Sequence, residues 1–377
     1  MEEIQGLDPR WQEEAYEAAE KSIDNTGKAC VVAPPGCGKT AIGVELLHNN
    51  PNKRAIWITE NSISIEQTRE HIQRRYGKPV EEVFPGLTFF TYGQYSKLKE
   101  KQLDELDTEL VVFDEIHRAG AQVWGVNPQK IAQKENIKIL GLTATPIRTD
   151  KQNMAEKICG GVSYELELAE AIARGIIPAP LVIHAKIIIE LEERQKQVNK
   201  ISDKKVREEY TARIQEIKRE IFEGEGIEEL LKTYLQQDGK YIVFCKNEKH
   251  LKEVKRDFTP LFQKVDPEVS FVTITSQRKK KENAISLQKL RDGVKDHLLI
   301  AFVIDMFNGS FHDKNLSGII RLRDTKSYIR LLQQWGRVLC WNMTHVPLVL
   351  DFTKSITMIK QFLLDVEERA ERYWKRT

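Results

Sequence analysis

Short apolar runs alternate with segments of helical pattern along the whole chain, and this alternation restricts the fold more than any other feature. The runs are nearly continuous in Val, Ile, Leu and Phe. Such strands are typical of parallel sheets that helices cover on both faces. We expect strands at residues 29–32, 55–59, 87–91, 110–113 and 138–142, and then at 181–189, 241–245, 270–275, 298–303, 318–322 and 347–352. The sequence therefore predicts an α/β protein whose mostly parallel sheets are flanked by helices.

The chain is long enough for two such domains. It has 377 residues, whereas a typical single domain has roughly 150. Residues 175–180 read Gly-Ile-Ile-Pro-Ala-Pro, which favours a boundary there. We expect one domain at 1–177 and a second at 178–377. A segment at about 190–223 is dense in Glu, Lys, Arg and Gln and predicts a charged helical insertion. It is either a solvated excursion, which its mixed charge favours, or an arm that binds nucleic acid or a partner.

Composition restricts the class of protein. Hydrophobic residues make up 41% and charged residues 30% of the chain, and the five cysteines are scattered. No run approaches the roughly 18 apolar residues of a membrane helix, and the first residues lack the order of a signal peptide. These features predict a cytoplasmic protein without a membrane partner, a disulfide framework or a zinc site. Residues 1–150 hold 18 Lys and Arg against 23 Asp and Glu, and the remainder holds 40 against 33, which permits contact with a polyanion.

Residues 33–40 read Ala-Pro-Pro-Gly-Cys-Gly-Lys-Thr and lie between the first strand and a helical segment. Strand, glycine-rich loop and helix in this order predict a phosphate-binding loop, with a chance Gly/Pro turn as the alternative. Gly36 and Gly38 allow the backbone N–H groups to face phosphate oxygens. Lys39 would reach the phosphates and Thr40 would bind Mg²⁺. The candidate nucleotide-binding residues of the loop are Pro35, Gly36, Cys37, Gly38, Lys39 and Thr40.

An acidic pair, Asp114 and Glu115, ends the expected strand at 110–113. Taken alone, such a pair is often a solvated strand end. Downstream of a phosphate loop it predicts an Mg²⁺ ligand in Asp114 and a base that positions the attacking water in Glu115, because phosphoryl transfer depends on positioning and charge neutralisation. The sequence thus predicts a nucleotide and Mg²⁺ as cofactors, with Thr40 and Asp114 as the metal ligands and Lys39 and both acids as catalytic residues.

Residues 114–117, Asp-Glu-Ile-His, resemble the DExH box of superfamily 2 helicases and translocases. Further segments resemble the other motifs of this family in the same order: Gln12 upstream, 58–60 with Gln67 (motif Ia), 90–94 (Ib), 143–146 (III), 241–245 (IV), 306–310 (V) and 333–337 (VI). The resemblance covers nearly the whole chain and extends to compact bacterial and phage members. It implies two tandem RecA-like domains with ATP bound in the cleft between them.

The resemblance also implies roles for single residues. Gln12 would read the adenine edge. Arg337 would act as an arginine finger with Gln333 beside it. The resemblance further implies that coupling of hydrolysis to strand movement depends on His117 with Thr143 and Thr145, and on His312 at a ribose hydroxyl. A packed or solvated imidazole is the alternative for His117, and a surface arginine is the alternative for Arg337.

Two positions depart from the family pattern. Many members carry a second arginine three residues after the first, where this chain has Cys340. A thiol cannot replace a guanidinium group at a phosphate, which predicts slower turnover. Motif V in the family usually has a charged residue, then a glycine, then an aspartate or histidine two positions further on. Here these positions are Gly309, Ser310 and His312, and this change weakens the expected coupling at that motif.

Contacts with a strand are expected from hydroxyl groups, amides and a few cations, because such motors hold mainly sugar and phosphate. The candidates are Thr59, Asn61, Thr91, Tyr92, Lys246, Asn247, Thr275 and Ser276. A basic run at 277–281 is either a further contact or a solubilising loop. The leading hypothesis is an ATP-dependent helicase or translocase that acts on DNA or RNA, as a single strand or a tailed or branched duplex. The alternatives are an ATP-controlled clamp or loader and the motor subunit of a larger complex, with protein partners in replication, repair or defence.

Overall fold

The computed structural model describes residues 6–120, 126–144, 152–184, 197–200, 202–223, 225–275, 277–304, 313, 315–322, 331, 334–336, 339, 345–353 and 355–375. The chain forms two compact units. Unit 1 contains Met1–Ile176 and Arg369–Thr377, and unit 2 contains Ile177–Glu368. The first boundary lies beside the Gly/Pro segment. The sequence had assigned residues 369–377 to the second domain, but Arg369 pairs with Glu167 and Glu170, both in unit 1.

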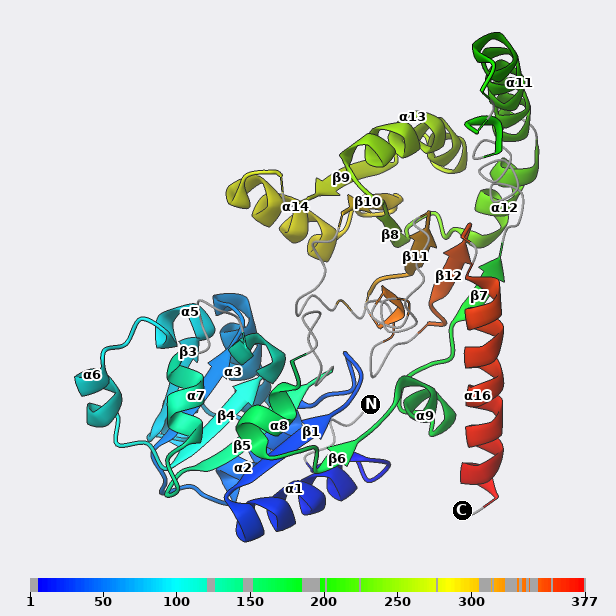
Figure 1. Cartoon of the computed structure of the whole chain (residues 1–377). Coiled ribbons are helices and arrows are strands. Elements are labelled where there is room, and N and C mark those ends of the chain that lie inside the picture. The colour runs from blue at the N-terminus through cyan, green and yellow to red at the C-terminus, as the bar shows by residue number, and fades with distance from the viewer. Residues whose placement is uncertain are drawn as a thin grey trace. The chain divides into compact units, whose positions relative to one another are not determined.

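Unit 1 is built on a six-stranded parallel sheet with the strand order β3-β2-β4-β5-β1-β6 (Figure 1). Its strands are β1 (Lys28–Val32), β2 (Ala55–Thr59), β3 (Leu87–Thr91), β4 (Leu110–Asp114), β5 (Lys138–Thr143) and β6 (Tyr164–Glu165). Its helices are α1 (Gln12–Thr26), α2 (Thr40–His48), α3 (Ser62–Tyr76), α4 (Val80–Val83), α5 (Tyr92–Tyr95), α6 (Glu100–Glu105), η1 (Ile116–Gly120), α7 (Val126–Ala132), α8 (Met154–Cys159) and α9 (Leu168–Ala173).

Unit 2 contains a second six-stranded parallel sheet, with the order β7-β12-β11-β8-β10-β9. Its strands are β7 (Leu181–His184), β8 (Lys240–Phe244), β9 (Ser270–Ile274), β10 (Leu299–Val303), β11 (Gly318–Arg321) and β12 (Leu348–Asp351). The helices that begin in it are α11 (Lys204–Glu223), α12 (Glu225–Tyr234), α13 (Glu248–Val265), α14 (Lys280–Asp292) and α16 (Ile356–Trp374). Two parallel sheets flanked by helices confirm the predicted fold class.

The strands agree with the apolar runs because each run is buried. All five residues of β2, β8 and β10 are buried, as are residues 110–113 of β4. Close packing also explains one glycine of α2, since a Cβ atom on Gly43 would lie 2.6 Å from the ring of Trp57. In unit 2 the core is rich in phenylalanine, with Phe262 of α13 packed edge-on against Phe302 of β10. Burial of these side chains is the main stabilising contribution in both units.

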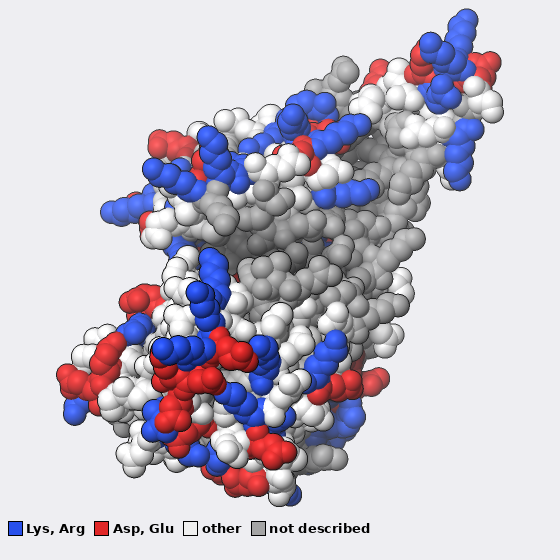
Figure 2. All heavy atoms as spheres, turned by 60° about the vertical axis from the view of Figure 1, so that its left-hand side comes forward, with Lys and Arg blue, Asp and Glu red and all other residues white. Residues whose placement is uncertain are grey.

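Helix α11 carries the charge that the sequence predicted for the inserted segment. Lysine, arginine and acidic side chains occur together on its surface (Figure 2). The ion pairs along it are long, such as Lys204 to Glu208 and Arg213 to Glu216, both at 3.9 Å. Exposed pairs of this kind contribute little to stability. The described part of α11 therefore fits a solvated helix, and among the described helices none is long and apolar enough to cross a bilayer.

Candidate active site at the carboxyl ends of β1, β4 and β5

Three neighbouring strands of unit 1 end at the same edge of the sheet. Strand β5 lies between β4 and β1, and Val32 of β1 is paired in register with Thr143 of β5. The phosphate loop follows β1, and the acidic pair follows or ends β4. Because parallel strands place their carboxyl ends together, ligands of such sheets bind at this edge. The fold thus brings the loop, Asp114 and Thr143 to one place.

The loop at 33–40 has the backbone that its two glycines permit. Gly36 and Gly38 have φ angles of 75° and 87°, in the left-handed region that disfavours side chains. The amide of Ala33 donates to the carbonyl of Thr143 at 3.0 Å, which fixes the start of the loop against β5. The loop then leads directly into α2 at Thr40. Its last residues therefore lie at a helix N-terminus, where exposed N–H groups favour anions.

Lys39 lies within this loop and is only 8% exposed. Its ammonium group donates to the carbonyl oxygens of Ala33 at 2.9 Å and Pro34 at 3.1 Å. These acceptors are neutral, so the positive charge of the ammonium stays available to an anion at the loop. The same charge acts on Asp114, where it opposes the rise in pKa.

Gln12, at the start of α1, contacts the loop. Its amide nitrogen donates to the carbonyl of Gly38 at 3.1 Å, and its amide oxygen accepts from the backbone N–H of Asp8 at 2.8 Å. These two bonds fix the orientation of the amide. One N–H and one lone pair of the amide remain for a ligand, as the predicted reading of adenine requires.

The acidic pair is partly buried and carries excess negative charge. Burial and, to a smaller extent, the charge of Glu115 raise the pKa of Asp114 to about 6, although Lys39 and the hydrogen bond from Thr59 oppose the shift. That bond runs from the Thr59 hydroxyl to Asp114 Oδ2 at 3.0 Å. Glu115 has a positive φ of 56°, a conformation that is unusual for a residue with a side chain and typical of functional turns.

His117 connects the acidic pair to β5. Its Nδ1 lies 3.2 Å from Glu115 Oε2 and 3.0 Å from Thr143 Oγ1. The expected contact between His117 and Thr143 is therefore present. Next to it, Arg118 pairs with Glu60 at 2.6 Å, a contact that joins the end of β4 to the end of β2 and that the sequence analysis missed. The sequence could have indicated a role for Glu60, because this residue belongs to the segment 58–60, which resembles motif Ia.

Three of the side chains that were predicted to contact a strand are buried, namely Thr59, Tyr92 and Thr275. Thr59 instead supports Asp114, and the hydroxyl of Tyr92 donates to the backbone carbonyl of the same residue at 3.1 Å. The ring of Tyr92 stacks on Phe113, with 6.4 Å between centroids, which explains its burial.

The remaining predicted contacts are accessible to different degrees. Asn61, Thr91 and Asn247 are at least partly exposed, and each side chain accepts a bond from the first turn of the helix that follows it. Such capping stabilises helix ends. Lys246 is exposed. Five predicted site residues lie outside the described residues: Thr145, Ser276, His312, Gln333 and Arg337. The altered position Cys340 lies outside them as well.

The chain is similar to one protein family in sequence and to several solved structures in fold. Residues 8–148 match the model of the ResIII family, described as type III restriction enzyme, res subunit. No curated protein sequence matches. Three solved structures are similar in fold over at least 94% of this chain, at 14–15% sequence identity.

The first is the ATP-dependent type ISP restriction-modification enzyme LlaBIII bound to DNA, with a TM-score of 0.57 and 14% identity; the match covers 98% of this chain, which spans 30% of that one. The second is a fragment of a putative HsdR subunit of a type I restriction enzyme from Vibrio vulnificus YJ016 (TM-score 0.59, 15% identity, 94% of this chain and 69% of that one). The third is the Hef helicase domain of Pyrococcus furiosus, with a TM-score of 0.52 and 14% identity. This match covers 94% of this chain and 97% of that one. Residues 8–148 therefore resemble a ResIII domain, and the chain has the tandem RecA-like fold of these solved structures.

Proposed function

We propose that this chain is a motor that hydrolyses ATP and moves along a DNA or RNA strand. One observation carries the proposal: the phosphate loop, the acidic pair and the pair formed by His117 and Thr143 lie together at one edge of the unit 1 sheet. DNA is the first strand to test, because LlaBIII is described as bound to DNA. Since this chain spans 30% of that enzyme, action as the motor part of a larger complex belongs to the proposal.

The residues present fit an Mg²⁺ ion. Burial first, and the charge of Glu115 second, raise the pKa of Asp114, and a divalent cation bound to this carboxylate would stabilise its ionised form. Within the described ranges no group of three or more His, Cys, Asp and Glu side chains could hold a metal ion. Mg²⁺ usually takes one or two protein ligands together with substrate phosphates. Asp114 and Thr40 would hold the ion, which would neutralise phosphate charge.

The chain's own residues supply the other parts of the reaction. Lys39 would leave its carbonyl acceptors to bind the phosphates of ATP, and the backbone of the loop would orient them. Glu115 would position the attacking water and accept its proton. His117, which bonds to Thr143 and lies beside Glu115, would move when the terminal phosphate is lost. In the proposal Arg337 and Gln333 complete the phosphate-binding groups, as the family resemblance implies.

An ATP-controlled clamp or loader that binds a strand without unwinding is the second candidate. The altered motif V and Cys340 in place of a second arginine favour it, because both changes weaken the expected coupling of hydrolysis to strand movement. A strand-displacement assay on tailed DNA and RNA duplexes separates the two candidates. A motor with unwinding activity displaces the strand when ATP is added. Strand binding and ATP hydrolysis without displacement on any of these duplexes would support the clamp instead.

Replacing Gly38 with alanine is expected to weaken ATP binding by about fivefold or more. The φ of 87° disfavours a side chain, and an added Cβ atom would lie 2.9 Å from Gln12 Nε2. The change therefore strains the loop and displaces the amide that should read adenine, at a cost of about 1–3 kcal/mol. Titration with a fluorescent ATP analogue measures the effect. Gly6→Ala is the matched control, since no atom lies within 4 Å of its added Cβ. Equal affinity in Gly38→Ala and Gly6→Ala would contradict the loop assignment.

A further inference from the structure

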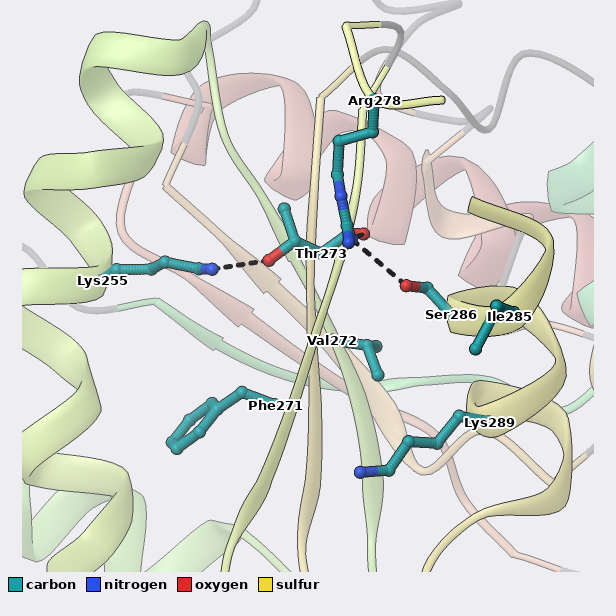
Figure 3. Close-up of a pocket in the computed structure, with 8 residues that line it drawn as sticks. All are labelled: Lys255, Phe271, Val272, Thr273, Arg278, Ile285, Ser286 and Lys289. Carbon is teal, nitrogen blue, oxygen red and sulfur yellow. Dashed lines mark hydrogen bonds between the residues drawn. The ribbon is translucent and has the colours of Figure 1, made fainter. Parts of the chain in front are cut away.

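A pocket of about 460 Å³ lies beside strand β9 of unit 2 (Figure 3). Residues 271–273 of β9 line it, together with Lys255 of α13 and Lys289 of α14. In the sheet order, β9 is the last strand and has β10 as its neighbour. Its other side is a sheet edge, where backbone groups are available for pairing with another chain.

The backbone of β9 presents alternate residues at this edge. The amide of Ser270 donates to Leu298 at 2.8 Å, and the carbonyl of Ile274 accepts from Ile304 at 3.2 Å, so the even-numbered residues face β10. In a parallel ladder the residues between them face the opposite way. Phe271 and Thr273 therefore direct their amide groups outward. The outward carbonyl of Thr273 accepts from Arg278. The N–H groups of Phe271 and Thr273 and the carbonyl of Phe271 are then the outward groups that another chain could pair with.

Cations lie on both sides of this edge. Lys255 Nζ donates to the hydroxyl of Thr273 at 2.5 Å, on the α13 side. Val272 points to the opposite side, where Lys289 and Ser286 extend from α14 (Figure 3). A strand added to β9 would alternate its side chains between the two faces. Neighbouring acidic side chains of such a strand would therefore meet Lys255 on one face and Lys289 on the other.

The pocket has more positive than negative charge. Arg278 pairs with Glu282 at 3.4 Å, but no carboxylate of the described residues lies within ion-pairing distance of Lys255 or Lys289. Burial lowers the pKa of Lys255, and the charge of Arg278 lowers it further, against the smaller effects of Cys245 and Glu248. An anion in the pocket would relieve this repulsion.

One lining residue of the pocket is apolar and unusually exposed. Ile285 of α14 is 62% exposed and lies beside Ser286 on the pocket wall. On the α13 side of β9, Phe271 also lines the pocket and is half-buried (Figure 3). A ligand with apolar as well as acidic groups would therefore bury additional surface here.

Two simpler accounts explain less. Lysines at a sheet edge can merely prevent aggregation, but this role needs neither a pocket nor the hydroxyl group of Ser286 beside Arg278, at 3.2 Å. A nucleic-acid backbone would satisfy the cations, but phosphate oxygens only accept hydrogen bonds and cannot donate to the carbonyl of Phe271. A peptide backbone both donates and accepts.

We infer that the edge of β9 binds an acidic, partly apolar peptide segment in extended conformation, which adds a strand to the unit 2 sheet. The backbone pairing supplies affinity, and the cations of α13 and α14 select acidic side chains. The binding uses no residue of the nucleotide site and is independent of the proposed ATP hydrolysis.

Fluorescence anisotropy with the full chain tests this. The probe is a labelled hexapeptide with two central glutamates flanked by valines. We expect binding at about 1 mM or tighter, and a loss of at least about tenfold in the double variant Lys255→Glu, Lys289→Glu. The control variant Lys252→Glu, Lys295→Glu makes the same charge change at exposed positions outside the pocket and should bind within about twofold of the wild type. If the double variant Lys255→Glu, Lys289→Glu does not fold, the double variant Lys255→Gln, Lys289→Gln replaces it, and we expect weaker peptide binding in this variant as well.

Two further arms test the backbone pairing. A hexapeptide that keeps the two central glutamates and has proline in place of both valines next to them lacks an N–H that would face β9 in either register, and it should bind at least about tenfold more weakly. Hydrogen exchange with the original peptide should slow at the amides of Phe271 and Thr273 and not at Val272, which already faces β10. The inference is overturned if the pocket variant binds the peptide as the wild type does, if neither amide is protected, or if the pocket binds oligothymidylate and not the peptide.

Discussion

The variant Glu115→Gln is expected to bind ATP with nearly wild-type affinity and to lose at least about 100-fold in strand-stimulated hydrolysis. Glutamine keeps the size of the side chain and can still contact His117, which lies 3.2 Å from the carboxylate. It cannot accept a proton from the attacking water. The expected effect is therefore on turnover and not on binding. Steady-state phosphate release and titration with a fluorescent ATP analogue measure the two separately.

Glu82→Gln is the matched control for this variant. Glu82 belongs to the same unit, lies on α4 and is exposed, so its loss should leave both quantities unchanged. A variant Glu115→Gln that hydrolyses ATP at the wild-type rate would remove Glu115 from the proposed role. Loss of binding and hydrolysis together would point instead to a structural role for this residue, whose φ of 56° is unusual.

The second large effect is expected on stability, from Asp351→Ala. Asp351 of β12 and Arg321 of β11 form an ion pair in which both side chains are fully buried. Removing the carboxylate leaves a guanidinium group buried without its partner charge, which typically costs 3–5 kcal/mol, and we expect about that loss in the free energy of unfolding of unit 2. Urea denaturation followed by circular dichroism measures it.

The surroundings of this pair supply its controls. The guanidinium group also donates to Gln334 Oε1 at 2.9 Å and to the hydroxyl of Ser355 at 3.3 Å. The double variant Arg321→Met, Asp351→Leu removes both charges, and we expect it to be less destabilised than Asp351→Ala. The exposed control Glu367→Ala should change stability by about 0.5 kcal/mol or less. A loss below about 1 kcal/mol in Asp351→Ala would mean that the pair behaves as a surface pair.

This network also bears on the predicted motif VI. Gln334 is buried and lies within the segment 333–337, which resembles that motif. Through its bond to Gln334, Arg321 fixes a described part of this segment against β11. In the proposed motor, Arg321 would position this segment through Gln334.

The sequence predicted the strands well because burial leaves a direct trace in it. A strand covered on both faces must be apolar at nearly every position, and runs such as 110–113 and 299–303 have that composition. Strand β6 was missed because it has two residues, neither of them buried, so no apolar run marks it. The run expected at 181–189 is described as a strand as far as His184, and the next residues lie outside the described part.

The environment of single side chains was harder to predict. Thr59 and Tyr92 follow or end apolar strands and carry hydroxyl groups, and the same pattern fits a strand contact or an internal support. Tertiary packing decides between them, through the bond from Thr59 to Asp114 and the stacking of Tyr92 on Phe113. The loop residues were easier to place, because the order of strand, glycines, lysine and helix admits few local conformations.

The central claim is that a nucleic-acid strand drives ATP hydrolysis at this site. The most direct measurement is the steady-state ATPase rate of the full chain with single- and double-stranded DNA and RNA side by side, in the wild type and in Lys39→Ala. The account predicts that at least one strand raises the wild-type rate by about fivefold or more, and that Lys39→Ala abolishes this increase. A wild-type rate that is the same with and without every strand, or stimulation that survives in Lys39→Ala, would contradict it.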